Sequence, residues 1–258
     1  MKALSIAASG MLAQQHRSEV VANNLANMNT TGYQRRRTEF NDLIYRHIQR
    51  RPKTGSSVGE TIPAGVHSGL GVNVGAVYRV HEQGSLKQTG NNFDLAIQGE
   101  GFFQVQLPNG DIAYTRDGAF QLNEAGQIVT HDGFTLQPGI AVPANATEIT
   151  VNASGEVLVT AADGITTNAG TILLATFPNP GGLSAVGDNM FIATDASGAA
   201  GAAVPGANGA GTVLQGFVES SNVNPIEEVS ALIRANRAYE MNSKVMSAAD
   251  QMMATRRN

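Results

Sequence analysis

Carboxylates are the residues of this chain whose types and spacing come closest to catalytic chemistry. Six acidic residues lie between positions 94 and 132, namely Asp94, Glu100, Asp111, Asp117, Glu124 and Asp132. Two of them held about 5 to 10 Å apart could cleave a glycosidic bond by acid and base catalysis. The chain has no tryptophan to stack against a sugar ring. The composition therefore disfavours sugar hydrolysis.

Metal and nucleophile chemistry also lack their residue patterns. The five histidines are far apart, without metal-ligand spacing, at His16, His47, His67, His81 and His131. The absence of cysteine removes thiol nucleophiles, disulfides and thiolate metal sites. The stretch DGAFQLNEAG at 117–126 lacks the alternating oxygen ligands of a calcium loop, and we interpret it as a β-turn. No phosphate-binding, hydrolase or zinc-protease motif occurs. We predict no catalytic residue, no cofactor and no metal, and hence no enzyme.

Charge divides the chain into a basic start and an acidic middle. Residues 1–53 carry nine lysines and arginines against three acidic residues, whereas residues 54–226 carry three against fourteen. A basic end suits a nucleic acid, an anionic membrane or an acidic protein surface. The acidic middle, and the lack of zinc-finger spacing or a basic zipper, argue against nucleic acid. For the run from Arg35 to Arg37, a solvated loop without a partner is the alternative.

The start of the chain does not have the pattern of a classical signal peptide. Its apolar stretch is short, is diluted by Ser5, Ser9 and Gly10, and lacks a cleavage site. No run of 18 or more apolar residues occurs that could span a bilayer as a helix. If the protein leaves the cytoplasm, we expect another export route.

Both ends of the chain carry a helical seam. Its positions alternate by four and three residues, which predicts a helix over about residues 3–28 and a second one from Pro225 onward. Asn29 to Gly32 are typical of a helix end, and Glu227 and Glu228 suit the positive start of the second helix. The first seam comprises Leu4, Ala8, Met11, Gln15, Ser18, Ala22 and Leu25, and the second comprises Val229, Leu232, Asn236, Tyr239, Ser243, Met246, Asp250 and Met253, widened by Ile226 and Ile233.

These seams contain many small or polar residues, so a lone pair of helices would gain little from packing. Ala8, Ser18 and Ser243 would instead allow neighbouring helices to approach closely. Two interpretations remain open: a helical hairpin that closes one domain, and assembly from many copies.

The middle of the chain predicts β-structure. Short β-prone runs such as FFQVQL and EVLVT alternate with glycine-containing turns, which favours a β-sandwich or an irregular barrel. Residues 196–211 are rich in glycine and alanine and predict a long surface loop. The fold class is therefore α+β. We predict a helical assembly domain at 1–30 with 225–258, an extended arm at 31–66, and a β-rich outer domain at 67–224.

The same segments resemble one known family. SEVVANNLANMNTTGYQRRRTEFNDL is similar to the N-terminal signature of the bacterial flagellar axial proteins, the family of rod and hook subunits. GFVESSNVNPIEEVSALIRANRAYE is similar to their C-terminal signature, and DLAIQGEGFFQVQLPNGD to the β domain of the longer members. The resemblance covers nearly the whole chain, and Met28 departs from the β-branched residue that is more usual there.

Length and one segment refine the resemblance. Short proximal rod subunits have almost nothing between their helices, and the hook subunit carries a further outer domain. The stretch from LIYRHIQRR to TIPAGVHSGLGV resembles the distal-rod members. The resemblance therefore implies a structural subunit of the distal rod. The alternatives are a proximal-rod subunit of similar length or another axial fibre subunit.

The resemblance also implies an assembly and its partners. Subunits would stack helically into a rigid hollow drive shaft that transmits torque from motor to hook, with the terminal helices as a coiled-coil layer around the channel. The expected partners are many copies of the chain itself, proximal rod subunits below, hook subunits above, the outer-membrane and peptidoglycan bushing rings, and the type III export apparatus. The expected location is the periplasmic rod, reached without a cleaved signal peptide.

The residues expected at the subunit contacts lie on the two helices and just after the first. Asn23, Asn24 and Asn27 either cap or bridge neighbouring chains through their amides or are ordinary polar surface. The expected assembly interface comprises Leu4, Ala8, Met11, Ser18, Ala22, Asn23, Asn24, Leu25, Asn27, Gly32, Tyr33, Val229, Leu232, Ile233, Asn236, Tyr239, Ser243, Met246 and Met253. A stiffening arm would use Arg46, Arg50, Arg51, Pro52, Ile62 and Pro63.

Overall fold

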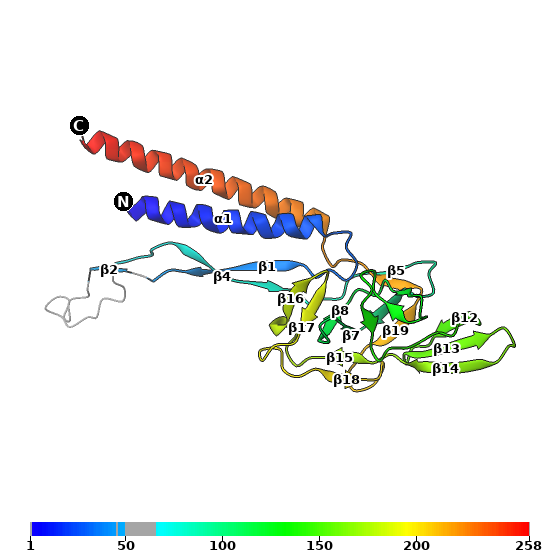
Figure 1. Cartoon of the computed structure of the whole chain (residues 1–258). Helices are drawn as coiled ribbons and strands as arrows, with labels where there is room; N and C mark the ends of the chain where they lie inside the picture. The colour runs from blue at the N-terminus through cyan, green and yellow to red at the C-terminus, as the bar shows by residue number, and fades with distance from the viewer. Residues whose placement is uncertain (1, 45, 50–65, 258) are drawn as a thin grey trace, which may run out of the picture. The chain divides into compact units, whose positions relative to one another are not determined.

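The computed structural model describes residues 2–44, 46–49 and 66–257 and divides the chain into two compact units. Unit 1 comprises Met1–Leu25, Arg36–Tyr78 and Pro225–Asn258, and unit 2 comprises Ala26–Arg35 and Arg79–Asn224. The chain order is a helix, a β-rich middle and a second helix (Figure 1). The predicted α+β class is confirmed.

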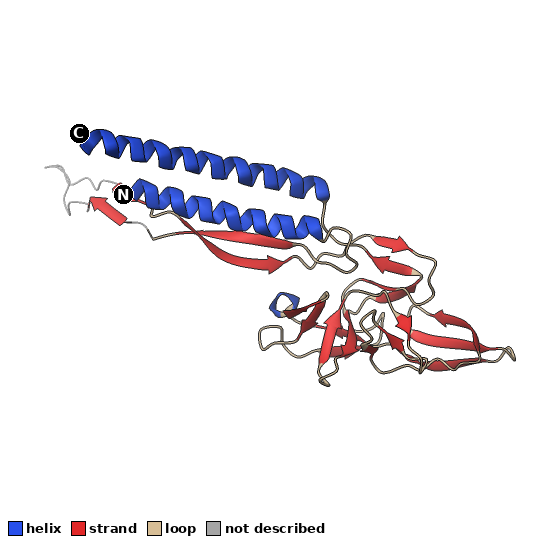
Figure 2. Cartoon of the chain, turned by 45° about the horizontal axis from the view of Figure 1, so that its top comes forward, coloured by secondary structure: helices blue, strands red, loops and turns tan. Residues whose placement is uncertain are grey.

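Two long helices belong to unit 1. Helix α1 spans Lys2–Ala26 and helix α2 spans Pro225–Arg257. They lie alongside each other with the two chain ends at the same side (Figures 1 and 2). Helix α1 ends two residues earlier than predicted, because the chain turns at Asn27, whose carbonyl accepts a hydrogen bond from the Thr30 amide at 3.2 Å. Gly32 then adopts a φ of 64°, which favours glycine.

None of the helices in the described part of the chain is long and apolar enough to cross a membrane.

Unit 1 also contains two pairs of strands. β1 (Arg36–Asp42) pairs with β4 (Val72–Arg79), and β2 (Arg46–Gln49) pairs antiparallel with β3 (Val66–Ser68). The start of β4 is hydrogen-bonded to α1, because the Val72 amide donates to Ser9 Oγ at 3.3 Å. Gly71 has a φ of 117°, and a Cβ there would collide with Ser9. Part of the range predicted as an extended arm is thus paired β-structure.

Unit 2 is built from short strands around two apolar clusters. Its largest sheet has the order β16-β17-β8-β7-β11-β10-β9, with β15 joining β7 to β18, and three smaller sheets are β12-β13-β14, β19-β6 and β20-β5. A short 3-10 helix, η1, spans Pro180–Gly182. The strands are β5 (Leu86–Gln88), β6 (Leu95–Gln98), β7 (Phe102–Gln106), β8 (Ile112–Thr115), β9 (Gln121–Leu122), β10 (Ile128–Val129), β11 (Thr135–Leu136), β12 (Ala146–Val151), β13 (Glu156–Ala161), β14 (Thr166–Thr171), β15 (Leu174–Thr176), β16 (Ser184–Gly187), β17 (Met190–Ile192), β18 (Gly201–Ala203), β19 (Thr212–Gln215) and β20 (Phe217–Glu219).

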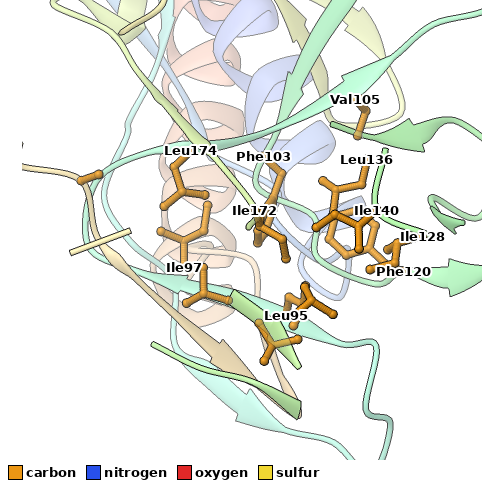
Figure 3. Packing of buried hydrophobic residues seen from close by; sticks show 14 of the residues in the cluster. Leu95, Ile97, Phe103, Val105, Phe120, Ile128, Leu136, Ile140, Ile172 and Leu174 are labelled. Carbon is orange, nitrogen blue, oxygen red and sulfur yellow. The ribbon is translucent and has the colours of Figure 1, made fainter. Parts of the chain in front are cut away.

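Strand β7 separates two apolar clusters. Because side chains alternate across a strand, Phe103 enters the larger cluster with Phe120, whereas Phe102 enters a smaller one with Tyr114 and Phe191. The Phe103 and Phe120 rings meet edge to face, with centroids 5.2 Å apart. Figure 3 shows how the side chains of the larger cluster gather from several strands. This core lies wholly within unit 2 and does not depend on the helices.

The predicted surface loop at 196–211 is wrong in part. Residues 201–203 form β18, which pairs with β15, and Ala203 and Ala210 are buried. Ser197 is fully buried, and its hydroxyl donates to the Thr194 carbonyl at 2.8 Å. Glycine and alanine carry too little side chain to show a β alternation, so pairing with β15 decides the structure here.

Candidate assembly surface

One stripe of α2 is covered, and it consists mainly of small or polar residues. Glu228, Ala235 and Ala249 are buried, and Asn242 between them is half-buried. These four positions are seven residues apart and therefore lie along one side of the helix. Gly10 of α1 faces this stripe, since a Cβ built on it would come within 2.8 Å of Asn242 Nδ2. A glycine on α1 and small residues on α2 thus permit close approach.

Several large apolar side chains of both helices are exposed. Ile233 is 48% exposed and Met252 67%, and on α1 Leu12 is 59% exposed. An exposed apolar side chain gains free energy when another surface covers it. The exposed apolar residues of the two helices are Ile6, Leu12, Ile226, Val229, Ile233, Tyr239, Met241, Val245, Met252 and Met253. We call this set the apolar helix surface.

The predicted α2 seam runs one residue away from the covered stripe. Val229 follows Glu228, Asn236 follows Ala235, and Ser243 follows Asn242. The seam residues Val229, Ile233, Asn236, Tyr239, Ser243 and Met253 are exposed, while Leu232 and Met246 are half-buried. Contact of these residues with another copy stays a prediction. Sequence reasoning missed Met241, Val245 and Met252, although the spacings of four and seven residues between them are helical.

On α1, the predicted seam is partly covered within the chain. Gln15 and Ala22 of the seam are exposed, as is Asn23 next to it. Leu4, Ala8, Met11, Ser18 and Leu25 are half-buried. The fully buried apolar positions are Ala7, Ala13 and Val21, which lie beside the predicted seam. Helix α1 therefore uses part of its surface for its own chain and leaves the rest, including Leu12, exposed.

Three residues predicted at the interface are buried inside their own chain. Asn24 is 1% exposed, and its side chain bonds the main chain of Arg36 twice, so it is not available to a neighbouring copy. Gly32 and Tyr33 are buried in unit 2. A Cβ on Gly32 would come 2.6 Å from the Asp117 amide nitrogen. These residues hold the turn after α1, a role that the sequence alone did not separate from subunit contact. Asn27 is half-buried and accepts the Thr30 hydroxyl at 3.2 Å.

Most residues of the predicted stiffening arm are not among the residues that the structure describes. Arg46 lies in β2. Arg50, Arg51, Pro52, Ile62 and Pro63 fall outside the described residues.

A buried ion pair fixes unit 2 close to the turn after α1. Arg116 Nε lies 3.0 Å from Glu219 Oε2, and the side chains are 6% and 3% exposed. Arg116 Nη1 also donates to the carbonyls of Gly99 and Gly101 at 2.9 and 2.7 Å. Both charges are therefore paired and hydrogen-bonded, as a buried pair requires.

His81 lies near this pair in an environment that disfavours its charged form. Its ring meets Phe102 edge to face at 6.5 Å, and neither buried ring nitrogen has a hydrogen-bond partner among the described residues. Burial, and then the positive charges of Arg79 and Arg116, lower the pKa of His81 below its usual value of 6.5. Burial alone raises the pKa of Tyr114. His81 is therefore neutral in the folded chain near pH 7.

One hollow in unit 2 is lined by a single titratable side chain. A hollow beside β7 is lined by Glu100, Phe102, Phe177, Pro178 and Pro180, with no second titratable group to pair with the Glu100 carboxylate. Across the described ranges, no three histidines or carboxylates lie close enough together to hold a metal ion. The apolar helix surface remains the strongest candidate for function.

Three family models match this chain in order. A flagella basal body rod protein model matches residues 4–34, a flagellar hook protein FlgE/F/G D1 domain matches 96–159, and a flagellar basal body rod FlgEFG protein C-terminal model matches 214–256. The chain is 54% identical to the flagellar basal-body rod protein FlgG of Caulobacter vibrioides and 46% identical to that of Agrobacterium fabrum, in each case over 98% of this chain and 97% of the relative. Identity to FlgG of Bacillus subtilis is 34% over the same shares of the two chains.

Proposed function

The chain belongs to the family of flagellar basal-body rod proteins, and from that premise we propose that it forms the distal part of the rod. It is a structural subunit of the bacterial flagellum. Within the proposal, many copies stack helically into a rigid hollow shaft that carries torque from the motor to the hook.

One observation carries this proposal: the apolar helix surface lies on the two segments matched by the rod-protein models at the chain ends. Each exposed apolar residue gains free energy when a neighbouring copy covers it. A helical stack supplies such neighbours to every copy except those at the ends. We propose that α1 and α2 then form a coiled-coil layer around the channel, with unit 2 outside it.

The remaining parts of the proposal concern neighbours and route. The partners are proximal rod subunits, hook subunits, the surrounding outer-membrane and peptidoglycan rings, and the type III export apparatus that delivers the chain to the periplasm without a cleaved signal peptide. Residues 46–65 would stiffen the shaft by wedging against adjacent copies. No step of this function needs catalysis, so the protein would act without enzymatic activity.

The test is complementation of a bacterium that lacks its own distal-rod protein. Expression of this chain should restore complete basal bodies with hooks, and gold-labelled antibody should mark the rod next to the hook. Label at the motor end would instead support the alternative, a proximal-rod subunit of similar length. Failure to restore rods despite export of the chain would refute the proposed function.

A further inference from the structure

The chain passes between its two units four times. The crossings fall between residues 25 and 26, 35 and 36, 78 and 79, and 224 and 225. These four backbone segments link unit 2 covalently to unit 1, and each can carry torque between the units. Each crossing segment alone can rotate readily, because every residue has two rotatable backbone dihedral angles.

Asn222 joins three of these crossings through one side chain. Its Oδ1 accepts the Arg35 amide at 2.7 Å, and its Nδ2 donates to the carbonyls of Val80 and Glu82, both at 2.9 Å. Arg35 precedes the second crossing, Val80 follows the third, and Asn222 itself precedes the fourth. The Val80 amide also donates to the Arg35 carbonyl at 2.9 Å. Three separate backbone segments of unit 2 are thus held by one amide group.

Asn24 connects the first crossing to the second in the same manner. Its Nδ2 donates to the Arg36 carbonyl at 2.9 Å, and its Oδ1 accepts the Arg36 amide at 2.8 Å. Asn24 precedes the first crossing and Arg36 follows the second. Because Arg35 and Arg36 are neighbours in the chain, the two asparagines bind adjacent residues. The hydrogen bonds of Asn24 in unit 1 and those of Asn222 in unit 2 therefore meet at the peptide bond between Arg35 and Arg36, and together they involve all four crossings.

Glu219 adds further hydrogen bonds within unit 2, close in sequence to Asn222. Its carbonyl accepts the Gly32 amide at 2.8 Å, and its Oε1 accepts the Gly84 amide at 3.0 Å. Its other oxygen is paired with Arg116 in the buried ion pair. Buried polar networks whose members are satisfied hold their surroundings in one arrangement.

We propose that Asn24 and Asn222 are positioning residues that make the four crossings deform together, so that torque is shared among them. This inference rests on the proposed function. Lateral hydrogen bonds prevent one crossing from rotating while the others stay still. Loss of either asparagine would leave each unit folded but let single crossings yield in turn under load.

The test begins with the purified full-length chain. Asn24→Ala and Asn222→Ala remove the two side chains, and Asn222→Asp keeps an acceptor for Arg35 while removing the donors to Val80 and Glu82. Amide exchange measured by NMR should accelerate at least tenfold at Arg36 in Asn24→Ala and at Arg35 in Asn222→Ala. Unchanged exchange at both amides would overturn the proposed role.

Asn152 supplies a matched control. Its side chain also makes several hydrogen bonds, accepting the amides of Ser154 and Glu156 and donating to the Glu156 carboxylate, but it lies in the turn between β12 and β13, remote in sequence from every crossing. Asn152→Ala therefore removes a comparable network without touching the crossings.

The decisive measurement counts complete basal bodies per cell in the complemented bacterium, once with unpowered motors and once after rotation in viscous medium. The Asn24 and Asn222 variants should match the unaltered chain without rotation and fall several-fold after it, whereas Asn152→Ala should not fall. Equal counts in both states, or equally low counts in both, would overturn the inference. Absence of rods with the unaltered chain would instead refute the proposed function itself.

Discussion

Replacing Ile233 by aspartate should block assembly and leave the single chain folded. Ile233 lies on the apolar helix surface and is 48% exposed. Complete burial of an isoleucine side chain gains about 1.5 to 3 kcal/mol, so covering the exposed half in a rod would gain about 1 kcal/mol per copy. In a rod, Ile233→Asp would lose this gain and would also place a carboxylate against an apolar neighbour.

The expected magnitude is large because the two effects add. Burying a charged group without a partner costs several kcal/mol even after the surroundings relax. A factor of ten in an equilibrium constant corresponds to about 1.4 kcal/mol. The concentration at which Ile233→Asp forms sedimentable polymer should therefore rise at least about 100-fold. The free energy of unfolding of the dilute chain should change by less than about 0.5 kcal/mol, as for most surface substitutions.

The matched control is Ile165→Asp, which makes the same change at a 59% exposed isoleucine in the turn between β13 and β14. Its critical concentration should match that of the unaltered chain. Polymerisation is followed by sedimentation and by counting complete basal bodies in the complemented bacterium. Normal polymerisation of Ile233→Asp, or equal losses in both variants, would refute the assignment of the apolar helix surface.

Three further predictions concern the neutral histidine, the buried ion pair and the arm. The folded chain holds the pKa of His81 below 6.5, so near and below that pH the unfolded chain binds more protons than the folded chain. Urea denaturation should therefore show a lower free energy of unfolding at pH 5.5 than at pH 7.5, with His81 contributing at most about 1.4 kcal/mol per pH unit. His81→Leu should lessen this pH dependence, and an unchanged dependence would refute the role given to His81. Glu219→Gln should lower the free energy of unfolding in the same assay by about 3 to 5 kcal/mol, because it leaves the buried Arg116 charge unpaired. Glu82→Gln, in the more exposed pair of Glu82 with Arg35, should lower it by at most about 1 kcal/mol. Equal losses in the two variants would contradict the account. Deletion of residues 50–65 should give rods that electron microscopy shows to be curved, and an unchanged persistence length would count against a stiffening arm.

Much of unit 2 could be predicted because its strands carry side chains that mark their two faces. In β13, the buried Val157 and Val159 alternate with half-buried neighbours, and this pattern is visible in the sequence. Strand β18 could not be predicted, since Gly201 and Ala203 have little side chain and depend on β15 for pairing. Strand β1 is largely charged and polar and depends in the same way on β4.

The candidate surface was harder to predict than the helices that carry it. A heptad pattern shows that a helix has a side to bury, but it does not say which neighbour covers that side. On α2, the stripe that contains Ala235 and Ala249 is covered within the chain itself. The predicted seam beside this stripe stays largely exposed. Asn24 was equally ambiguous, because an asparagine amide pairs as well with its own backbone as with another subunit.

The central claim is that the helices complete their packing only when copies assemble. Hydrogen exchange followed by mass spectrometry on the dilute chain and on assembled rods tests it most directly. The account predicts that α1 and α2 exchange faster in the dilute chain than in rods, while residues 95–215 of unit 2 are equally protected in both. Equal protection of both helices in the dilute chain and in rods would contradict it.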